Sequence, residues 1–124
     1  MKPFLPLALA CTASLILGAC SRDVSYRDQI QPVFNARCVD CHSADQHSGK
    51  IVLASYDQMM SSKTVSGRAP LVAPGNPNES RLFILCATAQ AHFRMPPDTS
   101  TKTPLTRQEL EALRDWIRQG AKNN

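Results

Sequence analysis

The chain has 124 residues and a formal net charge of +4, with nine prolines and only 6% aromatic residues. A chain of this length favours a single domain with a modest hydrophobic core. Its basic residues are scattered, without the run or stripe that a nucleic-acid-binding surface requires. Few aromatic residues and many prolines suggest that something other than side chains fills part of the interior.

The first twenty residues have the pattern of an export signal. Lys2 supplies the positive charge, and residues 4–17 form an apolar stretch that is too short to span a bilayer as a stable helix. The stretch ends in Leu-Gly-Ala directly before Cys20, which resembles the processing site of bacterial lipoproteins, where the cysteine is lipidated. We therefore predict a lipoprotein signal peptide over residues 1–19 and lipidation of Cys20. An ordinary cleaved signal with an incidental cysteine is the alternative.

Lipidation of Cys20 would anchor the mature chain to a membrane. Each buried methylene group contributes about 0.8 kcal/mol, so more than one acyl chain gives stable attachment. Residues 20–25 would then be the lipidated cysteine and its tether, and residues 26–124 the folded domain. We expect this domain to face the periplasm, and Ser21 after the cysteine, rather than Asp, slightly favours the outer membrane.

Four segments are predicted to be helical, and no βαβ pattern is present. Apolar residues at spacings of three and four predict a first helix over residues 24–37, in which Pro32 bends the chain or starts a new turn. Residues 55–60 predict a helical turn, and residues 80–91 predict a further helix. A capping box begins the last helix at Thr106, and four apolar residues at helical spacing form its buried face.

Residues 38–42 read Cys-Val-Asp-Cys-His, which is the attachment pattern of haem c. Cys38 and Cys41 lie on one side of a helical turn, where both thiols can add to the two vinyl groups of one haem edge. The next residue, His42, can then bind the iron from below the ring. Attachment of this kind takes place outside the bacterial cytoplasm, in agreement with the export signal. The pattern therefore predicts one covalent haem c.

Three other uses of these cysteines compete with haem attachment. A redox-active dithiol of the thioredoxin kind expects a strand–helix context, which this sequence lacks. A structural zinc site needs a second pair of ligands, which Cys86 and His92 could supply. A structural disulfide suits an oxidising compartment, but it leaves the following histidine, His42, unexplained.

An electron carrier with six-coordinate iron needs a second axial ligand on the far face of the haem. Met95 is the first candidate, because two prolines follow it, stiffen the backbone and remove two amide donors. A methionine ligand raises the reduction potential relative to a second histidine. His92 is the strongest rival, and an open sixth position is a further alternative. The remaining candidates are Met59 and Met60, in a segment with the pattern of core packing, and His47, which is too near the haem motif.

With these residues in view, the chain resembles a class I cytochrome c domain, of the small kind found beside bacterial oxidoreductases. The shared pattern runs in order through most of the mature chain and is most specific at its end. It comprises Ile30-Gln31-Pro32-Val33-Phe34, the haem motif, Gly49, Leu53, Tyr56, Pro74-Gly75-Asn76-Pro77, Ser80-Arg81-Leu82, Met95-Pro96-Pro97 and Trp116-Ile117-Arg118-Gln119-Gly120-Ala121. The resemblance implies an all-α cytochrome c fold, with N- and C-terminal helices packed around one covalent haem. It also implies His42 and Met95 as axial ligands.

The expected function is that of a periplasmic, membrane-anchored mono-haem c-type cytochrome that transfers electrons and is not an enzyme. Its expected partners are redox proteins, such as a dehydrogenase, another cytochrome, or a terminal oxidase or reductase. One alternative is a five-coordinate haem c that acts as a sensor or a peroxidase-like catalytic subunit, and another is a non-haem redox or metal module. Tyr56, Arg68 and Arg81 are candidate hydrogen-bond donors to the haem propionates. Cys86 is expected to be a small buried hydrophobic residue, with an intermolecular disulfide or redox-active thiol as the alternative.

Overall fold

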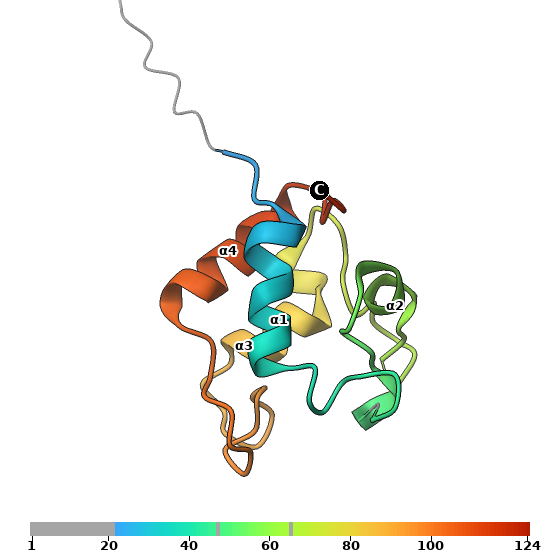
Figure 1. Cartoon of the computed structure of the whole chain (residues 1–124), viewed down its shortest axis with the longest axis vertical. Coiled ribbons are helices and arrows are strands. Elements are labelled where there is room, and N and C mark those ends of the chain that lie inside the picture. The colour runs from blue at the N-terminus through green and yellow to red at the C-terminus, as the bar shows by residue number, and fades with distance from the viewer. Residues whose placement is uncertain (1–21, 47, 65) are drawn as a thin grey trace, which may run out of the picture.

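The computed structural model describes residues 22–46, 48–64 and 66–124, so the predicted signal peptide and Cys20 lie outside the described residues. Every regular element in these ranges is helical. In chain order the elements are η1 (Tyr26–Ile30), α1 (Gln31–Arg37), η2 (Ser48–Lys50), α2 (Tyr56–Ser61), η3 (Pro77–Glu79), α3 (Arg81–Ala87) and α4 (Arg107–Arg118). Figure 1 shows η1 and α1 as one continuous rod between α4 and α2. Across the described ranges, no helix has the length and apolar character needed to cross a membrane.

The first helical rod changes its hydrogen-bond register close to Pro32. In η1, which is a π-helical segment, the amide of Gln31 donates to the carbonyl of Tyr26. Pro32 then occupies the first turn of α1, where its missing amide costs no hydrogen bond. Ser25 caps the start of the rod, because its hydroxyl accepts the amide of Asp28 at 3.2 Å. Of the two predicted roles for Pro32, a bend in the chain or the start of a new turn, the structure shows the second.

The last helix, α4, begins and ends where the sequence predicts. The Thr106 hydroxyl accepts the amide of Glu109 at 3.2 Å, and the Glu109 carboxylate accepts the amide of Thr106 at 2.6 Å. This reciprocal capping box satisfies two amides that the first turn leaves free. At the other end, Gly120 has a φ of +101°, which is a conformation that favours glycine.

An aromatic cluster joins the N-terminal and C-terminal helices. The ring centroid of Tyr26 on η1 lies 5.5 Å from that of Trp116 on α4 and 5.2 Å from that of Tyr56 on α2. The Tyr56 hydroxyl donates to the carbonyl of Ala121 at 2.8 Å, and the Trp116 indole donates to the carbonyl of Lys122 at the same distance. Trp116 is only 1% exposed. The predictions of an all-α fold with packed terminal helices, and of a buried apolar face on the last helix, are therefore confirmed.

The third α-helix, α3, is shorter than the helix predicted over residues 80–91. It ends at Ala87, because Thr88 takes up an extended backbone conformation with φ −68° and ψ 138°. The chain then turns back, and the amide of Met95 donates to the carbonyl of Leu85 at 2.9 Å. This hydrogen bond fixes the segment that carries Met95 against α3.

Candidate functional site

The Cys-x-x-Cys-His segment starts at the residue that ends α1. The carbonyl of Cys38 accepts the amides of Cys41 at 3.1 Å and His42 at 3.0 Å, so the segment forms a tight turn. Cys38 is 9% exposed and belongs to the core, whereas Cys41 is exposed, and both thiols are free. Burial raises the pKa of the Cys38 thiol to about 12, so this thiol is protonated at neutral pH. The two cysteines therefore differ in environment although they share one turn.

A backbone carbonyl orients the ring of His42. The Nδ1 atom of His42 lies 3.3 Å from the carbonyl oxygen of Ile51. Because a carbonyl oxygen only accepts, this contact assigns the ring proton to Nδ1 and leaves the lone pair on Nε2. The amide of Leu53 also donates to the His42 carbonyl at 2.7 Å, which ties the loop back to the motif. The ring thus has one nitrogen held by the backbone and the other available as a metal ligand.

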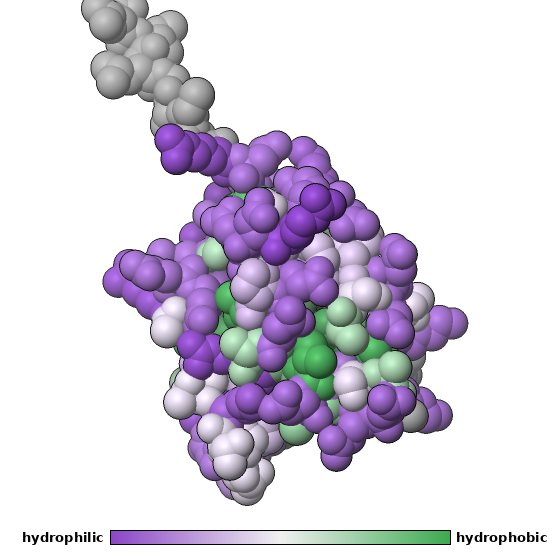
Figure 2. Space-filling view, in the orientation of Figure 1, coloured by the Kyte–Doolittle hydropathy of each residue, from purple (hydrophilic) through white to green (hydrophobic). Residues whose placement is uncertain are grey.

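A cavity of about 510 Å³ opens beside His42. Its lining is mostly apolar and consists of Cys41, His42, Ser48, Gly49, Ile51, Thr64, Ser66, Arg81, Leu85, Met95 and Pro97. Two compartments of about 50 and 30 Å³ share part of this lining and also contact Cys38. Cavities of about 300 to 1,000 Å³ hold small molecules and cofactors. Figure 2 shows hydrophobic side chains at the surface in the middle of one face, within a rim of hydrophilic ones.

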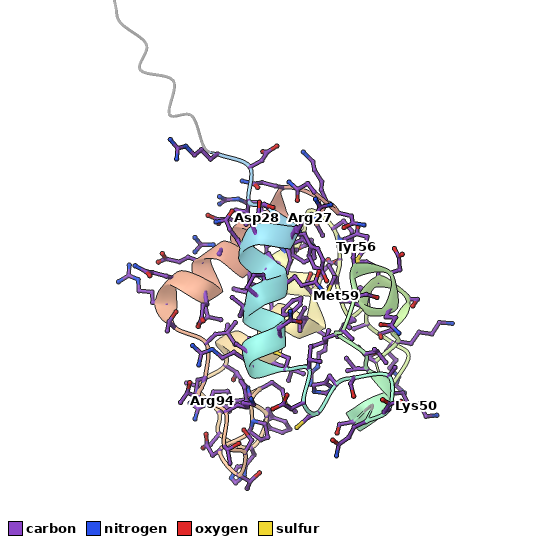
Figure 3. The ribbon with its side chains drawn as sticks, viewed as in Figure 1. Arg27, Asp28, Lys50, Tyr56, Met59 and Arg94 are labelled. Atoms are coloured by element: carbon purple, nitrogen blue, oxygen red, sulfur yellow. The ribbon has the colours of Figure 1, made fainter. Side chains whose placement is uncertain are left out.

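His42 and Met95 line the large cavity and both smaller compartments. The three rival ligands among the described residues do not share this position. Met59, a residue of α2 that Figure 3 labels, is fully buried in the core. Met60 lines a separate groove, and His92 is exposed in the turn after α3. Among these four residues, Met95 is therefore the one that the fold places in the cavity beside His42.

The zinc ligands weighed from the sequence are not assembled in the described part of the chain. No three His, Cys, Asp or Glu side chains there are grouped in a way that could hold a metal ion. Cys86 lines the same small compartment as Cys38, but His92 lies in an exposed turn. His47, the remaining histidine, lies outside the described residues.

Two ion pairs beside the motif had no clear signal in the sequence. Asp40, between the two cysteines, is exposed and pairs with Lys102 at 2.6 Å, which connects the motif to the loop before α4. Arg37 pairs with Glu109 of the capping box at 2.9 Å. Partial burial alone would raise the pKa of Glu109, but hydrogen bonds from Thr106 and Arg37 outweigh it and hold that pKa below its ordinary value. Because these partners are far apart in the chain, sequence spacing could not predict them.

The residues around the cavity fit a covalently attached haem c. Two thiols stand on one turn, an imidazole nitrogen and a thioether share the cavity, and the wall between them is largely apolar. This donor set is the one that c-type haem uses for attachment and for iron ligation. The fold and the site together define a c-type cytochrome domain.

Comparison with known families agrees with this class. Residues 38–99, half of the chain, match the family model described as Planctomycete cytochrome C, and the chain belongs to this family. The matched segment starts at Cys38 and includes Met95. Comparisons with curated proteins and with solved structures gave no significant match. Membership of a c-type cytochrome family implies covalent haem c and haem-based electron transfer, and such proteins are typically electron carriers rather than enzymes.

Proposed function

We propose that the protein is a mono-haem electron carrier of the class I type, with thioether bonds to Cys38 and Cys41 and with His42 and Met95 as axial ligands. The observation that carries this proposal is that His42 and Met95 line the same cavity and the same two compartments. When bound, the haem supplies an iron that accepts and gives up one electron. The protein would supply and position the ligands around it.

The backbone around each proposed ligand supports this assignment. The Ile51 carbonyl holds the His42 ring, and the Leu85 carbonyl accepts the Met95 amide at 2.9 Å. The His42 ring and the Met95 backbone are therefore each held by a backbone carbonyl. A thioether opposite the imidazole raises the reduction potential above that of a bis-histidine haem, which suits transfer to an oxidising partner.

We also propose that Cys20 is lipidated and that the domain faces the periplasm. The Leu-Gly-Ala-Cys sequence supports lipidation, and haem c attachment supports export. Hydrogen bonds attach the end of the tether and the start of the domain to the residues that follow α4. The Val24 amide donates to Gln119 Oε1 at 2.7 Å, and the Tyr26 amide donates to Asn124 Oδ1 at 2.9 Å. In Figure 1 this end lies opposite the end of α1 that leads into the haem motif, so redox partners would reach the site from the periplasm.

The test is an absorption spectrum of exported protein in the membrane fraction, oxidised and reduced, with the haem retained after denaturation. We expect a c-type spectrum and covalent haem. The double variant Cys38→Ala, Cys41→Ala should lose the covalent haem. The variant Cys20→Ala should keep the haem but leave the membrane fraction, which separates the anchor from the cofactor. Exported wild-type protein without covalent haem would show that the proposed function is wrong.

A further inference from the structure

Three cations line the cavity and its compartments within the described residues, and two of them are already paired. Arg37 pairs with Glu109 at 2.9 Å, and Lys102 pairs with Asp40 at 2.6 Å. Arg81 lines the large cavity, and the ion pairs of residues 22–46, 48–64 and 66–124 do not include it. Its guanidinium group is therefore the unpaired positive charge at the cavity wall.

Four polar residues of the large cavity, which Cys41 also lines, lie apart from the two compartments that contact the buried Cys38. Ser48, Thr64 and Ser66 line the large cavity together with Arg81, and none of these four lines a compartment that contacts Cys38. A haem has its vinyl groups at one edge and two carboxylates, the propionates, at the opposite edge. Thioether bonds hold the vinyl edge at the cysteines, so the propionates need polar partners elsewhere on the wall.

We propose, on the basis of the haem site proposed above, that Arg81 forms an ion pair with a haem propionate. A guanidinium group presents parallel N–H donors that match the two oxygens of a carboxylate. The pair would hold the propionate edge of the cofactor against α3. The positive charge of Arg81 would also offset the negative charge of the propionate close to the iron. This neutralisation favours the ferrous over the ferric state, so it raises the reduction potential.

The other two propionate partners considered from the sequence lie away from the cavity. The hydroxyl of Tyr56 donates to the Ala121 carbonyl at 2.8 Å within the aromatic cluster, and Tyr56 does not line the cavity. Arg68 lines a separate groove, together with Met60 and Lys63. The structure thus distinguishes Arg81 from two residues that the sequence could not separate from it.

The test compares Arg81→Gln and Arg81→Lys with the matched control Arg68→Gln, which removes the same charge from the neighbouring groove. We would measure the midpoint reduction potential and the propionate bending mode in the resonance Raman spectrum of the full holoprotein. Arg81→Gln should lower the potential at least about twofold more than Arg68→Gln, because a charge in contact with the cofactor is screened less than one farther away. Arg81→Lys should give a smaller decrease, since lysine offers a point charge without the paired donors. The Raman mode should shift in both Arg81 variants and not in the control.

An Arg81→Gln protein that matches the control in potential and in the Raman mode would overturn the ion pair while leaving the haem assignment intact. Wild-type protein without covalent haem would instead overturn the proposed function. The Arg81 side chain makes no described hydrogen bond, so we expect both variants to fold. Should Arg81→Gln fail to accumulate, an unshifted Raman mode in Arg81→Lys would by itself overturn the proposal.

Discussion

The carbonyl oxygen of Ile51 lies 3.3 Å from Nδ1 of His42, and the amide of Leu53 closes the same loop on the His42 carbonyl at 2.7 Å. The imidazole that the motif supplies is therefore oriented by the backbone of the next segment. Partners of this kind fix the tautomer of a ligating histidine and make its other nitrogen a better ligand. The proposed iron site thus depends on a loop fold as much as on the motif.

Replacement of Met95 should change the iron ligation, whereas replacement of His92 should not. In Met95→Ala we expect loss of the weak charge-transfer band that marks sulfur bound to ferric haem, and a lower reduction potential, because the thioether stabilises ferrous iron. His92→Ala is the matched control, since this exposed side chain does not line the cavity. Optical spectra and a redox titration measure both effects. A band lost in His92→Ala, or absent from the wild type, would contradict the assignment and favour His92 or an open sixth position.

The thiol of Cys86 should be inert in the native holoprotein. Cys86 is 5% exposed, and burial raises the pKa of its thiol to about 12, so little thiolate forms at neutral pH. With Cys38 and Cys41 bonded to haem, we expect no modification by a thiol reagent until the chain unfolds, as measured by mass spectrometry. Cys86→Ala is the control that abolishes labelling after unfolding. Rapid labelling of native protein, or a disulfide-linked dimer, would instead indicate a redox-active or intermolecular cysteine.

The two tyrosines of the aromatic cluster should respond differently to loss of their hydroxyl groups. Tyr56→Phe removes the donor to the Ala121 carbonyl and should lower the free energy of unfolding by about 0.5–1.5 kcal/mol. The hydroxyl of Tyr26 is buried and has no hydrogen-bond partner among the described residues, so Tyr26→Phe should be neutral or stabilising. Urea unfolding of the two variants measures the difference. Equal losses of stability would contradict this assignment of hydrogen bonds.

Glu109 should make the stability of the fold sensitive to acid. Its pKa in the folded state lies below the ordinary value of 4.5, despite partial burial, because of hydrogen bonds from Thr106 and Arg37. A carboxylate of this kind stabilises the fold above its unfolded pKa, and the contribution is lost as the pH falls through the folded pKa. Glu109→Gln should therefore lower the free energy of unfolding at neutral pH and flatten its decrease as the pH falls below the ordinary pKa of 4.5.

Urea unfolding at several pH values between about 3 and 7 tests the role of Glu109. Glu111→Gln on the same helix is the matched control, because its partner Arg107 is 91% exposed and exposed ion pairs contribute little. Acid profiles of Glu109→Gln and wild type that run parallel would show that this carboxylate does not set the acid limit of the fold.

Local signals predicted both ends of the last helix, but they did not predict the end of α3. The capping box of Thr106 and Glu109 acts through hydrogen bonds over three residues, so the sequence displays it directly. The end of α3 was predicted four residues too late, because the chain leaves the helix at Thr88 to bring Met95 back to the Leu85 carbonyl. The position of Met95 depends on this hydrogen bond between two segments, and no local sequence pattern predicts such a bond.

The sequence by itself was enough to predict the covalent chemistry of this protein. The cysteines and histidine of residues 38–42 are contiguous, so their spacing alone places two thiols and an imidazole on one turn. The tertiary structure decided which distant groups complete the site. It brings Met95 rather than His92 to the cavity, and it places Arg81 there without an ion-pair partner among the described residues. It also orients His42 through the backbone carbonyl of Ile51, a group that every residue type has. Such choices follow from packing between segments far apart in the chain, which residue spacing does not specify.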